Sequence, residues 1–239
     1  MGKRKHKRES AELYARVLQL AADSLLSLNE GFCNYRGDRF LDEMQLEMET
    51  VADPTLSRPS ELPMMKKFRF QLLHRWLLAN IAPCRMADVG GGKGLLSYLL
   101  QQSAWETAVI DPVDQALPTK YKDLRTNKQT AISPQEKVTR ITAEFQPDFA
   151  QDVDLLVAMH AHGCNIQMID AALHYGCDLI LLPCCVIHEP ILPPAGVQWI
   201  EWLLSYIIEK GFMVAPFRLN FKGQNIGMYA RPRSEVQLF

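Results

Sequence analysis

The stretch ADVGGGKGLLSYLL, residues 87–100, decides how the rest of the chain is interpreted. It holds a short apolar run with one carboxylate, Asp88, then four glycines in five positions, and then leucines at helical spacing. The glycines are Gly90, Gly91, Gly92 and Gly94. Glycine is costly in regular structure, so these positions indicate a sharp turn or a ligand that approaches the backbone closely. We therefore predict a strand, a binding loop and a helix, in that order.

Downstream of this stretch, short apolar runs alternate with helical segments. The runs expected to be strands are residues 84–90, 105–112, 137–145, 153–161 and 177–185. A long helix is predicted within 193–212, with prolines at its start and Gly211 at its end. Two further strands, 213–221 and 225–232, flank a hairpin turn. This alternation predicts an α/β fold: a mostly parallel sheet covered on both faces, with an antiparallel hairpin at the C-terminus.

The first 80 residues show helical periodicity and no strand alternation. A helix is predicted from a Ser10 cap to about Gly31, and a second one over 63–80. The segment 31–63 between them is mixed and includes a Pro/Ser-rich loop. We expect the helices to form a helical cap or a flanking layer. The predicted organisation is a basic tail (1–9), an N-terminal helical cap (10–80) and an α/β domain (81–239).

The charge of the chain is divided unevenly. The formal net charge is −1, with 26 Lys and Arg against 27 Asp and Glu. The stretch KRKHKR, residues 3–8, holds five of the basic residues, which leaves 21 basic against 27 acidic residues and a balance of −6 elsewhere. The basic stretch is typical of a nucleic-acid-binding arm, a localisation signal or a solvated terminus.

Apolar runs and cysteines bear on the location of the protein. No apolar run approaches the roughly 18 residues of a membrane span, and no signal peptide is recognisable, so a cytoplasmic protein is expected. The six cysteines form no CxxC pair, and the adjacent Cys184 and Cys185 indicate a reducing compartment. Cysteine and histidine spacings fit no standard zinc pattern, so we expect buried thiols and no metal.

The spacing of the glycines separates three kinds of phosphate or nucleotide loop. A P-loop requires GxxxxGK[ST], but Lys93 is followed by Gly94 and Leu95. A dinucleotide fingerprint requires GxGxxG, and its third glycine would fall where Leu95 stands. The chain instead has the pattern D-x-G-x-G-x-G, residues 88–94. A nicotinamide-dependent oxidoreductase is disfavoured by this spacing and stays open as an alternative.

In this pattern the chain resembles the class I S-adenosylmethionine (SAM)-dependent methyltransferases. The resemblance covers residues 84–239 in element order, including the closing hairpin, and implies a seven-stranded Rossmann-like sheet with SAM as cofactor. It implies that the backbone of Gly90–Gly94 approaches the methionine part of SAM, with Asp88 near its amino group. It also implies that Asp111 accepts hydrogen bonds from both ribose hydroxyls and that Glu144 contacts the adenine. Two fixed carboxylate oxygens suit a vicinal diol.

The loops after the fourth and fifth predicted strands carry the candidate catalytic residues. The fourth strand ends in AMHAHGCN, residues 158–165, which lacks the [DNS]PP[YF] signature of amino-methyltransferases. A histidine accepts a proton near neutral pH, as a general base must. The fifth strand ends in LLPCCVIHEP, residues 181–190. The predicted catalytic set is His160, His162, Asn165, Cys184 and Cys185, and we favour His160, which also belongs to the predicted cofactor site.

These two loops together resemble a branch of the same class with H-x-(C/H)-G and Cys-Cys loops, which includes tRNA ribose methyltransferases and enzymes acting on RNA or protein. His162 stands where a cysteine is more usual in that branch. A thiolate nucleophile at Cys184 or Cys185 is the alternative, as in RNA cytosine-C5 methyltransferases. The partner DxPC loop of those enzymes is absent, so direct methyl transfer with histidine assistance is favoured.

The expected substrate is RNA, possibly tRNA. The basic tail and the lysines and arginine of 66–69 favour it, whereas the acidic body does not. A protein or small-molecule substrate and a non-catalytic SAM-binding scaffold subunit remain the alternatives. No membrane partner is expected, and the sequence leaves the oligomeric state open.

Overall fold

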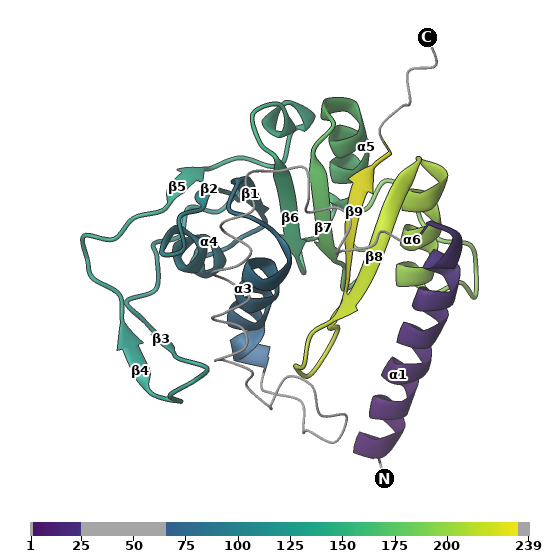
Figure 1. Ribbon diagram of the computed structural model, residues 1–239, viewed down its shortest axis with the longest axis horizontal. Helices are drawn as coiled ribbons and strands as arrows, with labels where there is room; N and C mark the ends of the chain where they lie inside the picture. The colour runs from purple at the N-terminus through teal and green to yellow at the C-terminus, as the bar shows by residue number, and fades with distance from the viewer. Residues whose placement is uncertain (1, 25–65, 234–239) are drawn as a thin grey trace.

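The computed structural model describes residues 2–24 and 66–233, which are built around one seven-stranded sheet (Figure 1). Its strands lie in the order β5-β2-β1-β6-β7-β9-β8. Their bounds are Arg85–Val89 (β1), Glu106–Ile110 (β2), Thr139–Ile141 (β5), Leu155–Met159 (β6), Asp178–Leu182 (β7), Phe212–Arg218 (β8) and Ile226–Pro232 (β9). A separate small hairpin consists of β3 (Lys120–Lys122) and β4 (Gln129–Ala131).

The strand directions confirm the predicted fold class. Strands β5, β2, β1, β6 and β7 pair in parallel, and β9 pairs antiparallel with both β7 and β8. This is the seven-stranded, mostly parallel, Rossmann-like sheet with a C-terminal hairpin that the sequence predicts. The third strand is shorter than expected, since only Thr139–Ile141 pairs within the predicted 137–145.

Helices cover both faces of the sheet, so its strands alternate between two hydrophobic cores. In the fully buried β6, Leu156 and Ala158 join one core, whereas Leu155, Val157 and Met159 join the other. The first core includes residues of α1 (Gly2–Ala21), α5 (Asn165–Tyr175) and α6 (Trp199–Glu209). The second includes residues of α3 (Arg69–Asn80) and α4 (Leu95–Gln101). Short 3₁₀ turns are η1 (Ala22–Ser24), η2 (Lys66–Phe68) and η3 (Pro147–Ala150).

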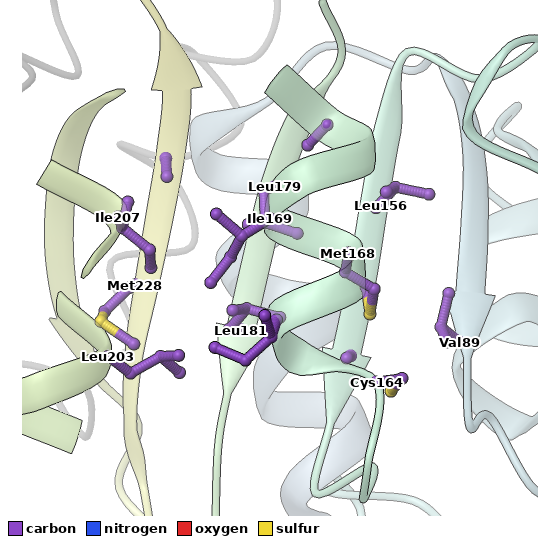
Figure 2. Close-up of a cluster of buried hydrophobic side chains, with 14 of the residues drawn as sticks. Val89, Leu156, Cys164, Met168, Ile169, Leu179, Leu181, Leu203, Ile207 and Met228 are labelled. Carbon is purple, nitrogen blue, oxygen red and sulfur yellow. The ribbon is translucent and has the colours of Figure 1, made fainter. Parts of the chain in front are cut away.

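The first core is drawn in Figure 2. Met168 and Ile169 of α5 lie over Leu179 of β7 and Leu156 of β6, and residues of α6 pack close to Met228 of β9. These side chains are buried almost completely. Truncating such a side chain to alanine typically costs about 2–5 kcal/mol, so this core fixes the strands whose ends carry the candidate site.

The described helices of the N-terminal region are flanking layers on opposite faces of the sheet. Helix α1 buries Val17 and Ala21 in the first core, and α3 buries Leu73 and Leu77 in the second. The predicted Ser10 cap is wrong, because α1 begins at Gly2 and runs through Ser10. Lysine and arginine are good helix formers, which allows the basic stretch to continue the helix. The predicted loop within 31–63 lies outside the described residues.

One other boundary differs from the sequence expectation, and further elements are present that it did not include. Helix α6 begins only at Trp199, because Gly196 has a φ of +83° and the chain turns there before the helix starts. Helix α5 and the β3–β4 hairpin were not anticipated from the sequence. Among the helices of residues 2–24 and 66–233, none combines the length and the apolarity needed to cross a membrane.

Candidate functional site

The candidate site is formed by loops at the carboxyl ends of neighbouring parallel strands. The glycine loop follows β1, Asp111 follows β2, the segment 160–164 follows β6, and 183–189 follows β7. Because parallel strands end at the same edge of a sheet, these loops meet where open α/β folds bind their ligands.

The glycine loop requires glycine for two different reasons. Gly90, Gly92 and Gly94 have φ values of +66°, +55° and +76°, a region that strongly favours glycine. A Cβ on Gly90 would lie 2.7 Å from the Cβ of Ala161, and one on Gly91 would lie 2.5 Å from Oδ2 of Asp88. At Gly90 and Gly91, the space that a side chain would need is therefore already occupied by other atoms of the protein.

Gly92 differs from its neighbours because the space beside it is open. A Cβ there would have only Nε2 of Gln115 within 4 Å, at 3.9 Å. The backbone N–H of Gly92 donates to Oδ2 of Asp111 at 2.8 Å. A ligand could therefore lie against the bare backbone at this residue while a carboxylate stands next to it.

Asp111 is buried and holds the end of β2 to the glycine loop. Its Oδ1 accepts a hydrogen bond from the N–H of Val113 at 2.9 Å, in addition to the bond from Gly92. A carboxylate has about four acceptor sites, so two remain for a ligand. The structure thus brings the predicted ribose-binding residue into contact with the predicted methionine-binding loop.

Sequence reasoning missed Arg140, which approaches the loop from β5. Its Nη2 donates to the carbonyl oxygen of Gly92 at 2.6 Å, and its Nε lies 3.9 Å from Oδ1 of Asp114. Its Nη1 is buried without a hydrogen-bond partner among the described residues. Both backbone groups of Gly92 are therefore bound by charged side chains. The signal in the sequence was an arginine within a predicted strand, where a charged residue needs a partner.

Asp88 lies beneath the glycine loop. It is 1% exposed, and its Oδ2 accepts a hydrogen bond from Oγ of Ser97 in α4 at 3.2 Å. Burial raises the pKa of this carboxyl to about 7. The hydrogen bond with Ser97 fastens the loop to the first turn of α4, and the position of Asp88 near the amino group of SAM stays a prediction.

Glu144, the predicted adenine contact, is exposed three residues beyond β5. It lies at the same edge of the sheet as the glycine loop, and its contact with the adenine of SAM stays a prediction.

His160 has an unusual backbone and a defined hydrogen bond. Its φ is +61°, rare for a residue other than glycine and typical of functional sites. Its Nε2 lies 2.9 Å from the carbonyl oxygen of Gln224, in the loop between β8 and β9. A carbonyl only accepts, so Nε2 carries the proton and, in the neutral ring, Nδ1 keeps its lone pair.

The surroundings of His160 keep its ring neutral. Burial lowers its pKa to about 4, and the nearby positive charges of Lys66 and Arg69 act in the same direction. At neutral pH the imidazole is therefore a hydrogen-bond acceptor at Nδ1.

His162, Cys184 and Cys185 form a second group beside His160. Nε2 of His162 lies 3.2 Å from Sγ of Cys184, which lies 3.7 Å from Sγ of Cys185. Burial, together with the neighbouring thiol, raises the pKa of Cys184 to about 11. A thiol that stays protonated at neutral pH is a poor nucleophile, and this disfavours the alternative in which a thiolate attacks the substrate.

Asn165, the remaining predicted catalytic residue, is only 1% exposed and begins α5. Its Nδ2 and its backbone N–H both donate to Oε1 of Glu189, at 2.5 and 3.1 Å, and the N–H of Ile166 donates to Oε2 at 3.2 Å. Glu189 thereby caps α5 and joins the loops after β6 and β7. The amide of Asn165 is thus engaged in this buried contact, and its catalytic role stays a prediction; sequence reasoning missed Glu189.

No protein-family model matches the chain. A curated relative, the "Probable tRNA (uracil-O(2)-)-methyltransferase" of Caenorhabditis elegans, is 30% identical over 104 residues. This match covers 43% of the chain and only 17% of that protein's length.

Two solved structures with a similar arrangement are named as a methylase and a methyltransferase. The ribosomal protein L11 methylase of Lactobacillus delbrueckii subsp. bulgaricus has a TM-score of 0.43 at 15% identity, over 72% of this chain and 82% of that one. Magnesium protoporphyrin IX methyltransferase (ChlM) of Synechocystis PCC 6803, solved with bound SAM, has a TM-score of 0.42 at 15% identity, over 87% and 99%. The strand order described above, rather than these distant likenesses, establishes the fold.

Substitution of Gly92 tests whether a ligand lies against the loop. We expect Gly92→Val to abolish the binding of SAM, the predicted cofactor, because the new side chain would fill the open space beside the backbone. The positive φ costs about 1–2 kcal/mol of stability, which leaves the protein folded. Isothermal titration calorimetry measures the binding, and circular dichroism monitors folding.

The matched control is Gly176→Val, since Gly176 has a φ of +73° and nothing within 4 Å of its Cβ, but ends α5 away from the site. It should carry a similar strain and bind SAM normally. Unchanged SAM affinity in Gly92→Val would contradict this assignment of the site.

The buried Asp88 predicts a dependence of stability on pH. Its pKa of about 7 lies above the ordinary value of 3.8, so the folded state holds the proton more tightly than the unfolded chain. The contribution of this group to stability is full below about pH 4 and is lost as the pH rises toward 7. Asp88→Asn, which carries no charge, should therefore gain stability relative to the wild type over this range, by about 4 kcal/mol at most.

Urea unfolding at several pH values between 4.5 and 8 measures the difference. The exposed Asp152→Asn serves as the control and should follow the wild-type curve. If the stability of Asp88→Asn also runs parallel to that of the wild type across this pH range, burial does not raise the pKa of Asp88 as described.

Proposed function

We propose that this protein is a SAM-dependent methyltransferase that transfers the methyl group directly to RNA, with tRNA as the favoured substrate. The observation that carries the proposal is the juxtaposition of two features at one edge of the sheet. One is the open Gly92 backbone beside Asp111, and the other is the neutral His160 in a strained conformation. The open backbone beside Asp111 suits the binding of a nucleoside cofactor. The neutral His160 suits a reaction in which the attacking hydroxyl must lose a proton.

The residues at the glycine loop fit the proposed cofactor. The space beside Gly92 would admit the methionine portion, and the two unused acceptor sites of Asp111 suit a ribose diol. The buried Nη1 of Arg140 offers a further donor to a bound ligand. When bound, SAM supplies an electrophilic methyl group.

His160 would orient and deprotonate the nucleophile. The hydrogen bond of Nε2 to Gln224 leaves Nδ1 as the acceptor, and the low pKa keeps that lone pair available at neutral pH. A hydroxyl that donates its hydrogen to Nδ1 has an oxygen lone pair free for the methyl group, and the proton passes to the ring as the new bond forms. This role requires neither a thiolate at Cys184 nor the buried Asn165.

Two observations favour an RNA substrate. Lys66 in η2 and Arg69 at the start of α3 lie close enough to His160 for their charges to lower its pKa, so cationic side chains border the site where a phosphate would pass. The curated relative is named as a probable tRNA (uracil-O(2)-)-methyltransferase, which supports tRNA as the substrate and an oxygen atom as the methyl acceptor. A cytoplasmic location belongs to the same proposal, since Cys84, Cys164, Cys177, Cys184 and Cys185 are free thiols.

Transfer of radiolabelled methyl groups from SAM into cell extract tests the proposal. The label should become sensitive to RNase, and its incorporation should fall steeply with added salt, because phosphate contacts are screened. His160→Ala should reduce incorporation at least about 100-fold, the usual contribution of a general base, while SAM affinity is kept. The exposed His174→Ala on α5 is the control and should leave the rate unchanged.

Other outcomes identify the alternatives. A label sensitive to protease, or one that is small and soluble, would contradict the RNA substrate. SAM binding without any incorporation, together with a silent His160→Ala, would indicate a scaffold subunit.

A further inference from the structure

We propose that His162, Cys184 and Cys185 bind one zinc ion in a site that has an open fourth position. Their Nε2 and two Sγ atoms all lie within 4.8 Å of one another. No ion is part of the structure, and the inference rests on the arrangement of the three side chains. It goes beyond the proposed methyl transfer and does not depend on it.

The distances among the ligand atoms fit a single tetrahedral ion. Two sulfurs bound at about 2.3 Å to one tetrahedral Zn²⁺ lie about 3.8 Å apart. The two Sγ atoms are separated by 3.7 Å, and Nε2 of His162 lies 3.2 Å from the nearer one. The atoms therefore need only a small adjustment to share an ion.

The framework around the three ligands holds them in place. His162 follows β6 and the two cysteines follow β7, and these strands are paired in parallel. Glu189 ties the two loops together through Asn165, and a Cβ on Gly163 would lie 2.9 Å from Cβ of His188. Ligands carried by packed loops on rigid strands are preorganised, which favours binding of the metal.

The composition and exposure of the group favour zinc. Thiolate and imidazole are preferred Zn²⁺ ligands, and two thiolates balance the charge of the ion. His162 is exposed and the cysteines are half-buried, so an ion can enter from solvent. Lys66 lies near Cys184, and a neutral zinc–dithiolate unit would not repel it.

Three protein ligands with an open position are typical of a zinc site that binds substrate. The group borders His160, since Sγ of Cys184 lies 4.0 Å from the carbonyl oxygen of that residue. The fourth ligand that fits there is an oxygen donor, such as a water, hydroxyl or phosphate oxygen. The sequence expectation of unliganded thiols followed from spacing alone, and spacing does not show that side chains from two separate loops lie together.

Cobalt substitution tests the site in the absence of SAM and RNA. The reduced full-length protein is stripped with a chelator and titrated with Co²⁺. We expect one Co²⁺ per chain, with the charge-transfer absorption of cobalt–thiolate bonds and the visible bands of a tetrahedral site, both removed by added Zn²⁺. His162→Gln and the double variant Cys184→Ser/Cys185→Ser should weaken Co²⁺ binding at least about 10-fold, and the double variant should also lose the charge-transfer band.

Cys84→Ser is the matched control, because Cys84 is a half-buried free thiol directly before β1, at the opposite end of the parallel strands from the site. It should keep the full spectrum and affinity. The proposal is overturned if the wild type gives no thiolate band, if Co²⁺ binding survives in the double variant with circular dichroism unchanged, or if Cys84→Ser loses binding equally. The cobalt titration does not measure activity, so its result stands even if the protein transfers no methyl group.

Discussion

The hydrogen bonds on the two backbone groups of Gly92 are the contacts on which the candidate site depends. Asp111 accepts from its N–H and Arg140 donates to its C=O, so side chains that follow β2 and lie on β5 fix a loop that follows β1. Hydrogen bonds to charged groups are roughly twice as strong as neutral ones. They hold the peptide in a left-handed conformation that leaves one side of the backbone bare, and the proposed cofactor site rests on that bare surface.

A second set of contacts fixes the other half of the same edge. Glu189 links the loop after β7 to the first residues of α5, and Ala161 packs so closely against Gly90 that no Cβ fits between them. The loops after β1, β6 and β7 are thus joined into one unit. This unit places His160 and the His162–cysteine group beside the glycine loop, which is the arrangement that binding and transfer chemistry both need.

The sequence was sufficient for features encoded by local patterns. Apolar runs predicted the strands of the sheet, and the D-x-G-x-G-x-G pattern predicted the glycine loop between the first strand and the following helix. The features it missed arise from contacts between distant residues. Arg140 meets Gly92 across 48 residues, and Glu189 meets Asn165 across 24 residues, so neither pairing has a local signal. For the same reason, the position of Asn165 beside the histidines did not reveal that its amide is buried.

The measurement that tests the central claim most directly is calorimetric titration of the full-length wild-type protein with SAM and, separately, with NAD⁺. If the Gly92 backbone and Asp111 form a site for the methyl donor, SAM binds saturably at one molecule per chain and NAD⁺ does not bind. Binding of NAD⁺ without binding of SAM would contradict the account and assign the glycine loop to a dinucleotide.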